Sequence, residues 1–490
     1  MKFLDKEQRQ QIGFTFVMDQ LEVMTPYGAE EKKDIKPFKI AHKDKLLKEL
    51  DDTEKVIEGI KTKKQLYSEV ERIFCKLKDI KSSIKRCKHN EALDDIELYE
   101  IKYFTLLNEE LLEVFNNLDL QIENIRMNSL EEAIVLLDPE GKRIPTFYIY
   151  DQYSERLKEI REEKTKLEHN ILKEEDEDTI IMLKQQRLDV VILEEEEELK
   201  VRRELSEKLS DYIHYFEQNM ESIGKLDFLM AKARLAIKYN AVKPRISKKM
   251  ELSLKDAVNP EIEEVLKSRE KSFTPVNIDL VDGTTVITGA NMGGKSVTLK
   301  TIVLNLLLGQ MGLYVFAKEA KLPVLDFVYF VSDDMQNISK GLSTFGAEII
   351  KLKEVINCVK TEKGFLALDE FARGTNPKEG LFLVKSLSKY LTKYDSISLI
   401  STHYDGVVEE DMVHYQVVGL KNVNFEALKY KIDLNKKHSV ELIQENMEYR
   451  LERVSKDSEV PKDALNISIL LGLDEDLVNI AKGFYDDREA

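Results

Sequence analysis

The chain has 490 residues and a formal net charge of −17 at pH 7, and 34% of its residues are charged. One compact core does not extend over such a length, so about two to four domains are expected. The negative charge opposes broad, non-specific attraction to a polyanion, but a local basic patch would still allow nucleic acid to bind. No apolar run reaches the ~18 residues of a membrane span.

The N-terminus and the cysteines indicate the compartment. The first residues contain no apolar signal core. The three cysteines, Cys75, Cys87 and Cys358, have no paired metal-ligand spacing and favour a reducing environment over a disulfide framework. We therefore expect a cytoplasmic protein with no membrane partner.

Glycine and proline are scarce in the first half of the chain. Only five of the 20 glycines precede residue 251, and apolar residues recur every three or four positions over 40–135 and 148–240. Such charge-rich stretches without helix breakers predict long helices. An antiparallel helical arm or coiled coil is the expected architecture, although the heptads are not regular enough to require it.

The middle of the second helical stretch is strongly acidic. Residues 151–200 hold nine Lys or Arg against 17 Asp or Glu, a net charge of −8, with acidic runs at Glu174–Asp178 and Glu194–Glu198. A solvated helix face or mobile tip is the ordinary interpretation, and a site for a basic partner is the alternative. In either case this surface is poorly suited to gripping phosphates.

From about residue 270 the pattern changes to short apolar runs separated by turns that contain glycine. Helical patterns lie between most of these runs, which predicts a largely parallel α/β sheet with a ligand at the carboxyl ends of its strands. Four buried strands are predicted, at Val286–Thr288, Phe327–Val331, Gly364–Asp369 and Ser396–Ser401. Beyond Asp405 the pattern is strand-like through Ile432 and helical from Asp463 to the end.

A glycine-rich loop follows the first of these strands and fits the phosphate-binding pattern G-x-x-x-x-G-K-[ST]. Backbone N–H groups of such a loop and the N-terminus of the next helix can hold a pyrophosphate. Lys295 would reach the β- and γ-phosphates, and the Ser296 hydroxyl would ligate Mg²⁺. The predicted nucleotide-binding residues here are Gly289, Asn291, Met292, Gly293, Gly294, Lys295, Ser296 and Val297.

Two later strands end in residues that could act on this phosphate. Asp369 and Glu370 end an apolar run, as in a Walker B segment: Asp369 would hold Mg²⁺, and Glu370 would orient and deprotonate the attacking water. His403 follows the next strand, where it could hydrogen-bond the γ-phosphate. Taken singly, a buried strand with an acidic turn and a structural histidine are the alternatives.

Together these residues resemble the MutS family of mismatch-repair ATPases. The similar stretches are Thr288–Ser296, Asp333–Asp334, Gly341–Phe345 with Glu348, Asp369–Glu370 with Arg373–Thr375, and Thr402–Tyr404; weaker similarity covers Phe14–Gly28, Leu226–Leu229 and Lys243–Arg245. The resemblance implies ATP and Mg²⁺ as cofactors and a dimer with composite, ABC-type ATP sites. Ser343 would reach the nucleotide of the other subunit, Asn291 would shape the phosphate loop, and Phe273 would pack on adenine or simply in the core.

The expected fold class is α plus α/β. The resemblance implies a helical core and lever region over 1–147, a long-helix arm and return over 148–245, a P-loop ATPase domain over 246–460 and a helical dimerisation segment over 461–490. The family's N-terminal mismatch-recognition and connector domains find no counterpart, and no Phe-x-Glu wedge is evident. Val297, Leu342 and Asn376–Pro377 depart from the family pattern and put the hydrolysis rate in question.

The expected function is a dimeric ATPase, as a homodimer or with a related chain, whose helical arms move on a bound partner. Duplex DNA, in repair or recombination, is the partner that the resemblance implies. A protein client is the alternative, for example in an ATP-driven reactivating factor for a cobalamin-dependent aminomutase, and the acidic arm favours it. A pseudoenzyme scaffold is opposed by intact Lys295, Ser296, Asp369 and Glu370.

Overall fold

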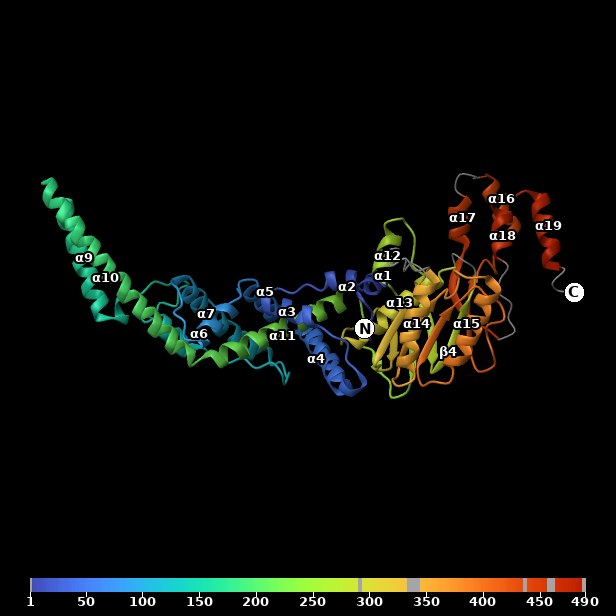
Figure 1. The fold of residues 1–490 in the computed structure, drawn as a ribbon, viewed down its shortest axis with the longest axis horizontal. Helices are drawn as coiled ribbons and strands as arrows, with labels where there is room; N and C mark the ends of the chain where they lie inside the picture. Colours follow the sequence, from blue (N-terminus) through green and yellow to red (C-terminus); the bar gives the residue numbers. More distant parts are fainter. Residues whose placement is uncertain (1, 290–292, 333–343, 435–438, 456–462, 487–490) are drawn as a thin grey trace. The chain divides into compact units, whose positions relative to one another are not determined.

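The computed structural model describes residues 2–289, 293–332, 344–434, 439–455 and 463–486 (Figure 1). The chain forms two compact units. The sheet unit comprises Met1–Leu21, Lys36–Asp51 and Arg234–Ala490, and the helical unit comprises Glu22–Ile35 and Asp52–Ala233. The helical unit thus takes residues from both domains predicted before residue 246. Over the described residues, no helix has the length and apolar character needed to span a membrane.

Long helices build the helical unit, as the two breaker-poor stretches predict. Its helices are α3 (Pro26–Asp34), α5 (Lys64–Phe74), α6 (Lys81–Lys88), α7 (Asp95–Leu118), α8 (Glu131–Leu137), α9 (Glu155–Lys173) and α10 (Glu177–Ser210), while α4 (Lys43–Thr62) and α11 (Ile213–Lys238) each continue into the sheet unit. Aromatic rings form part of the core: the ring of Phe104 lies 6.2 Å from that of Tyr27 and 6.0 Å from that of Phe216. Buried Asp227 accepts hydrogen bonds from the backbone N–H groups of Met24 and Thr25 and so fixes the start of α3.

Helices α9 and α10 form an antiparallel hairpin (Figure 1). The chain turns at Glu174–Asp176, and the Asp176 carboxylate caps α10 by accepting from the N–H of Thr179 at 2.9 Å. Along the hairpin, Arg161 of α9 pairs with Glu194 at 3.0 Å and with Glu198 at 2.7 Å. The acidic run that begins at Glu194 therefore lies partly against α9 and is partly neutralised by it.

The sheet unit contains a six-stranded sheet in the order β10-β9-β4-β8-β7-β6. Its strands are β4 (Gly283–Thr288), β6 (Phe327–Val331), β7 (Gly364–Asp369), β8 (Ile397–Ser401), β9 (Val413–Gly419) and β10 (Glu448–Arg453). All neighbours are parallel except β9 and β10, which are antiparallel. The four predicted strands are confirmed. Helices α13 (Lys295–Gln310), α14 (Thr344–Val359) and α15 (Pro377–Leu391) connect them.

A smaller sheet, in the order β1-β5-β2-β3, accompanies the first. It consists of β1 (Arg245–Ile246), β5 (Glu319–Leu322), β2 (Glu251–Ala257) and β3 (Val276–Val281), with α12 (Pro260–Lys267) between β2 and β3. The N-terminal helices α1 (Lys6–Gln11) and α2 (Phe14–Gln20) also belong to this unit. Phe3 forms a parallel bridge with Val328, so the N-terminal segment covers the open edge of β6.

The region after β9 corrects the strand-like pattern expected through Ile432. Residues Phe425–Leu434 form helix α16, because Phe425, Leu428 and Ile432 recur at helical spacing and bury one face. That face packs in a small apolar cluster, here called the C-terminal cluster, with residues of the following helices. These helices are α17 (Ser439–Asn446) and α18 (Asp463–Leu470). Helix α19 (Glu475–Asp486) follows, and α18 and α19 lie within the predicted helical end.

Candidate functional site

The carboxyl ends of three neighbouring strands meet at one level of the six-stranded sheet. Strand β8 lies between β4 and β7, and Ser401 is the register partner of both Ile287 and Asp369. The backbone N–H of Thr402 continues this alignment by donating to the Ile287 carbonyl at 2.9 Å. The described residues at or directly after the ends of these strands are therefore brought to one edge: Gly289, the Asp369–Glu370 pair and His403.

Two glycines shape the loop after β4. Gly289 has φ +133°, and a Cβ there would lie 3.0 Å from the Cβ of Val417 on β9. Gly294, which caps α13, has φ +84°, and a Cβ there would lie 3.1 Å from the ring of Tyr449 on β10. Both positions therefore require glycine for its backbone conformation and for the close approach of a neighbouring strand.

Lys295 begins α13 and is buried, with 3% of its side chain exposed. Its Nζ donates to the Gly289 carbonyl at 2.7 Å and lies 3.4 Å from Oε1 of Glu370. Burial lowers the pKa of the ammonium group, and the Glu370 carboxylate opposes this shift. The lysine is thus folded back across the base of the loop, with its charge directed to the end of β7.

Asp369 is the buried carboxylate of the site. Its Oδ1 accepts from the Ser401 hydroxyl at 2.6 Å, and the Ser296 hydroxyl also donates to this carboxylate. Burial raises the pKa of Asp369, and the two hydroxyl hydrogen bonds oppose the shift. Oxygen ligands from a carboxylate and a serine hydroxyl are those that Mg²⁺ prefers, so Ser296 and Asp369 fit this ion.

Glu370 adopts a left-handed backbone conformation, with φ +50°. This conformation is uncommon for a residue with a side chain and costs about 1–3 kcal/mol. It is held by the N–H of Glu370, which donates to the Ser401 carbonyl at 3.1 Å. The Arg373 guanidinium lies 2.8 Å from Oε2 of Glu370 as an ion pair. The Glu370 carboxylate is therefore held between Lys295 and Arg373 at the carboxyl end of β7.

His403 lies half-buried beside this carboxylate. Its Nδ1 is shielded from solvent and has no hydrogen-bond partner among the described residues. Burial lowers the pKa of the imidazole; Glu370 opposes the shift, while Lys295 and Arg373 add to it. A neutral imidazole with a free ring nitrogen can hydrogen-bond an incoming polar group.

The structure describes some, but not all, of the other predicted site residues. Gly293 is buried in the loop, and Val297 is half-buried in the first turn of α13. Phe273 is half-buried in the segment between α12 and β3, and its contact with adenine stays a prediction. Asn291, Met292 and Ser343 lie outside the described residues.

Several residues of the site were not predicted from the sequence. Ser401 bonds both Asp369 and Glu370, and its position directly before Thr402–Tyr404 could have identified it. Val417 and Tyr449 press on the loop glycines, and His414 of β9 hydrogen-bonds Thr288 at 2.8 Å. These contacts depend on β9 lying beside β4, for which the local sequence carries no signal.

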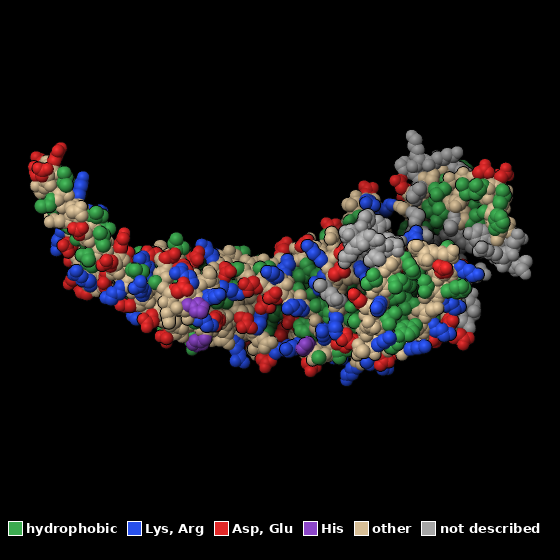
Figure 2. Space-filling model, in the orientation of Figure 1, with side chains coloured by type: hydrophobic (Ala, Val, Ile, Leu, Met, Phe, Trp, Pro, Cys, Tyr) green, Lys and Arg blue, Asp and Glu red, His purple; other side chains and the backbone are tan. Residues whose placement is uncertain are grey.

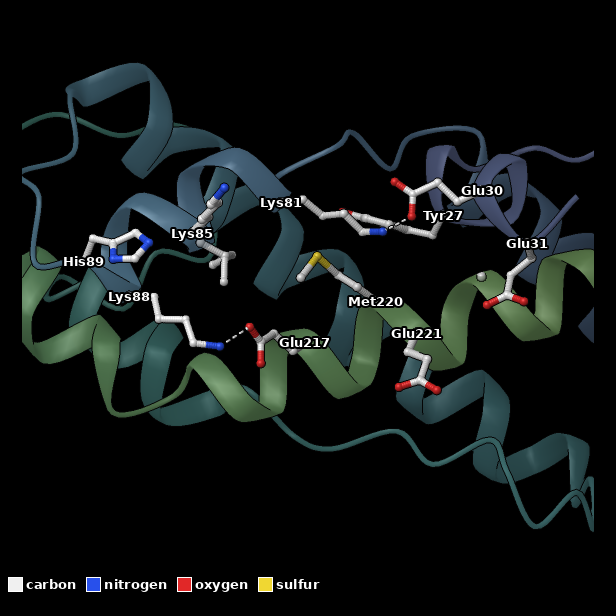
Figure 3. Close-up of a pocket in the computed structure, with 12 residues that line it drawn as sticks. Tyr27, Glu30, Glu31, Lys81, Lys85, Lys88, His89, Glu217, Met220 and Glu221 are labelled. Carbon is white, nitrogen blue, oxygen red and sulfur yellow. Dashed lines mark hydrogen bonds and ion pairs between the residues drawn. The ribbon is translucent and has the colours of Figure 1, made fainter. Parts of the chain in front are cut away.

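The helical unit has a separate cavity of about 540 Å³ between α3, α6 and α11 (Figure 3). Tyr27, Ile84 and Met220 form part of its lining. Charged residues border it in opposite pairs: Lys81 pairs with Glu30, and Lys88 lies 2.8 Å from Glu217. The lining thus carries charges of both signs rather than a patch of one sign.

The aligned strand ends, the glycine loop opening α13 and the buried lysine and carboxylate are features of P-loop nucleotide-binding α/β domains. Comparison with known proteins agrees, because residues 285–469 match the family described as MutS domain V. Residues 285–469 are therefore similar to domain V of the MutS family.

Two curated relatives illustrate the extent of the similarity. The chain is 34% identical over 206 residues to the endonuclease MutS2 of Ligilactobacillus salivarius (strain UCC118), covering 42% of this chain and 26% of that protein. It is 31% identical over 240 residues to the DNA mismatch repair protein MutS of Staphylococcus aureus (strain JH9), covering 48% of this chain and 27% of that protein. The chain thus spans about a quarter of the length of these relatives.

Proposed function

We propose that this protein is a MutS-like ATPase that binds ATP at the carboxyl edge of the six-stranded sheet and hydrolyses it. The observation that carries the proposal is the strand register, in which Ser401 of β8 pairs with Ile287 of β4 and with Asp369 of β7. Through this register, Lys295 and Ser296 from one strand end meet Asp369 and Glu370 from another. No single motif would require that meeting.

Each residue has a chemical role in this proposal. Lys295 exchanges its bond to the Gly289 carbonyl for the β- and γ-phosphates. Glu370 accepts a proton from the attacking water, and the ion pairs with Lys295 and Arg373 orient its carboxylate. The free Nδ1 of His403 hydrogen-bonds the γ-phosphate. Ser296 and Asp369 would hold Mg²⁺, which neutralises charge on the phosphates.

A second subunit completes the site in this proposal, with Ser343 contributed from the other chain. An apolar helix face supports the pairing. Helix α19 exposes Leu477, Ile480 and Phe484 at helical spacing, with 51%, 64% and 68% of each residue accessible. Ile480→Glu should therefore convert a dimer to monomers in sedimentation analysis, whereas Glu475→Gln should not. A wild-type chain that is monomeric with and without ATP contradicts this part.

The partner of the helical unit is the second part of the proposal. The names of the relatives suggest DNA, in mismatch repair or recombination. The α9–α10 hairpin favours a protein client, because Asp and Glu outnumber Lys and Arg by 17 to nine over residues 151–200, and several of the cations already pair with carboxylates. Arg161 pairs with Asp151, Glu194 and Glu198, and Arg187 pairs with Glu168 at 2.7 Å. The net negative charge of the hairpin therefore opposes binding to DNA phosphates.

ATP turnover tests the enzymatic part. Lys295→Ala should abolish Mg²⁺-dependent phosphate release, because the buried ammonium lies 2.7 Å from the Gly289 carbonyl at the start of the loop. Lys378→Ala, on the exposed first turn of α15, is the matched control and should keep wild-type turnover. Equal turnover in all three proteins would contradict the site assignment.

Salt-dependent binding separates the two partners. A protein that uses DNA should bind duplex DNA at about 50 mM salt and lose affinity steeply as salt rises. A protein that uses a client should show no such binding while still turning over ATP. DNA affinity with a steep salt slope would remove the client alternative.

A further inference from the structure

The outer face of α10 carries apolar side chains that no other described element covers. Ile181, Leu188 and Ile192 are 66%, 51% and 48% exposed, and Met182 and Leu193 beside them are 55% and 42% exposed. The spacing of seven and then four residues places the first three on one stripe of the helix. We call these five residues the outer stripe.

The outer stripe lies opposite the side of α10 that packs on α9. That inner side contains Val190 and Glu194, which are buried, and Arg187, which pairs with Glu168 of α9. A helix that is apolar on its inner side alone would suffice for a hairpin. An additional apolar stripe on the solvent side indicates a surface that another molecule covers.

Charge restricts what can cover the stripe. Over residues 177–199, eight Asp or Glu outnumber two cations, Lys184 and Arg187, and Asp189, Glu195 and Glu196 lie exposed beside the stripe. Figure 2 shows acidic side chains next to apolar ones along this hairpin. Nucleic acid would be repelled, and a second copy would bring the same excess of negative charge to the interface.

We propose that the outer stripe of α10 is a docking surface for a protein segment that carries apolar side chains flanked by Lys or Arg. Apolar side chains of the partner cover Ile181, Leu188 and Ile192. Its cations pair with Asp189, Glu195 and Glu196, which also orients the segment. This proposal does not depend on the ATPase proposal, because none of these residues belongs to the sheet unit.

Site-specific photo-crosslinking of the full chain in its own cells tests the surface. A benzoylphenylalanine replaces Ile192, and the cross-linked partner peptide is sequenced by mass spectrometry. The same photoreactive residue at Ile96, an exposed apolar position on α7, gives the background. We expect a reproducible protein adduct whose mapped segment combines Lys or Arg with apolar residues.

A positive charge introduced into the outer stripe provides the second measurement. Leu188→Lys should reduce the adduct about tenfold, the loss typical of an interface side chain. Val135→Lys, at a similarly exposed apolar position on α8, should leave the adduct unchanged. Circular dichroism and ATP turnover of both variants should match the parent, since neither position is buried.

Each contrary outcome overturns the proposal. These are an adduct no stronger than that at Ile96, an adduct to nucleic acid or to a second copy of this chain, a mapped segment without cations, and an adduct that survives Leu188→Lys. If the parent, Leu188→Lys and Val135→Lys proteins all lacked ATP turnover, only the ATPase proposal would be contradicted. The cross-linking result would still test the docking surface.

Discussion

The carboxyl edge of the six-stranded sheet and the α9–α10 hairpin use charged residues in opposite ways. At the sheet edge, Lys295 and Asp369 are buried, and their pKa values shift because water is excluded. Along the hairpin, Arg187 and Glu168 are about 40% exposed and simply neutralise each other. Burial of charge costs free energy, so the sheet edge keeps its charges despite that cost, as sites that bind charged ligands do.

The two regions also differ in the kind of ligand that they suit. Lys295, Asp369 and Glu370 converge from two strand ends on one small volume, which suits a phosphate. The hairpin spreads its carboxylates along a helix and leaves apolar side chains between them, which suits a protein surface. The predictions below change one region at a time and are ordered by expected effect.

The largest effect is expected at Glu370. Glu370→Gln removes the proposed base but keeps the size of the side chain, so turnover should fall by about 10²- to 10⁴-fold while ATP still binds. Phosphate release and equilibrium binding of labelled ATP measure the two properties. Glu379→Gln, exposed on α15, is the control. Unchanged turnover in Glu370→Gln would remove the glutamate from the mechanism.

A smaller effect on binding is expected at Tyr449. Its ring lies against Gly294 at the start of α13 and also packs on the C-terminal cluster. We therefore expect it to hold the end of the phosphate loop in place. Tyr449→Ala should weaken ATP binding about tenfold by loosening the loop, and Tyr449→Phe should retain affinity. Tyr430→Ala, 67% exposed on α16, controls for loss of a tyrosine. Equal affinities in all four proteins would show that the contact does not position the loop.

At Asp369 the expected effect is on stability. Burial raises the pKa of this carboxyl, so the ionised carboxylate lowers the free energy of unfolding at pH values above its folded-state pKa. This loss of stability disappears as the pH falls below that pKa and the carboxyl becomes protonated. Asp369→Asn should therefore be more stable than wild type at pH 7 by about 1 kcal/mol, while losing Mg²⁺-dependent turnover. Thermal unfolding at pH 7 and at about pH 4 measures the difference, which should shrink at the lower pH. A less stable variant at pH 7 contradicts the desolvation argument.

The smallest effect is expected on the hairpin. Arg187→Ala breaks the ion pair with Glu168, but both groups are well exposed, so the free energy of unfolding should change by about 0–0.5 kcal/mol. Urea unfolding measures it, and the change should decrease further in high salt. A loss above about 1 kcal/mol would mean that hairpin charges contribute to stability as buried groups do.

The parts that could be predicted from sequence are those with local signals. Val286–Thr288 and Gly364–Asp369 are apolar runs of strand length, and the loop between Gly289 and Ser296 fits a fixed spacing. Their meeting at one edge follows from the general rule for parallel sheets. The long helices follow from the absence of glycine and proline.

Other parts depend on strand order and on packing between distant segments. Ser401 joins Asp369 and Glu370 because β8 lies between β4 and β7, which no local pattern specifies. Tyr449 reaches Gly294 across more than 150 residues of sequence. Helix α16 was missed because the strand-like pattern beyond Asp405 was extended through Ile432, whereas packing on the C-terminal cluster favours the helical period.

Calorimetric titration of Mg²⁺–ATP into the Glu370→Gln protein tests the central claim most directly, because it measures binding without turnover. We predict saturable binding with one nucleotide per chain, and its loss when Lys295→Ala is added. Absence of binding in Glu370→Gln, or binding that persists with Lys295→Ala, would contradict the assignment of this sheet edge as an ATP site.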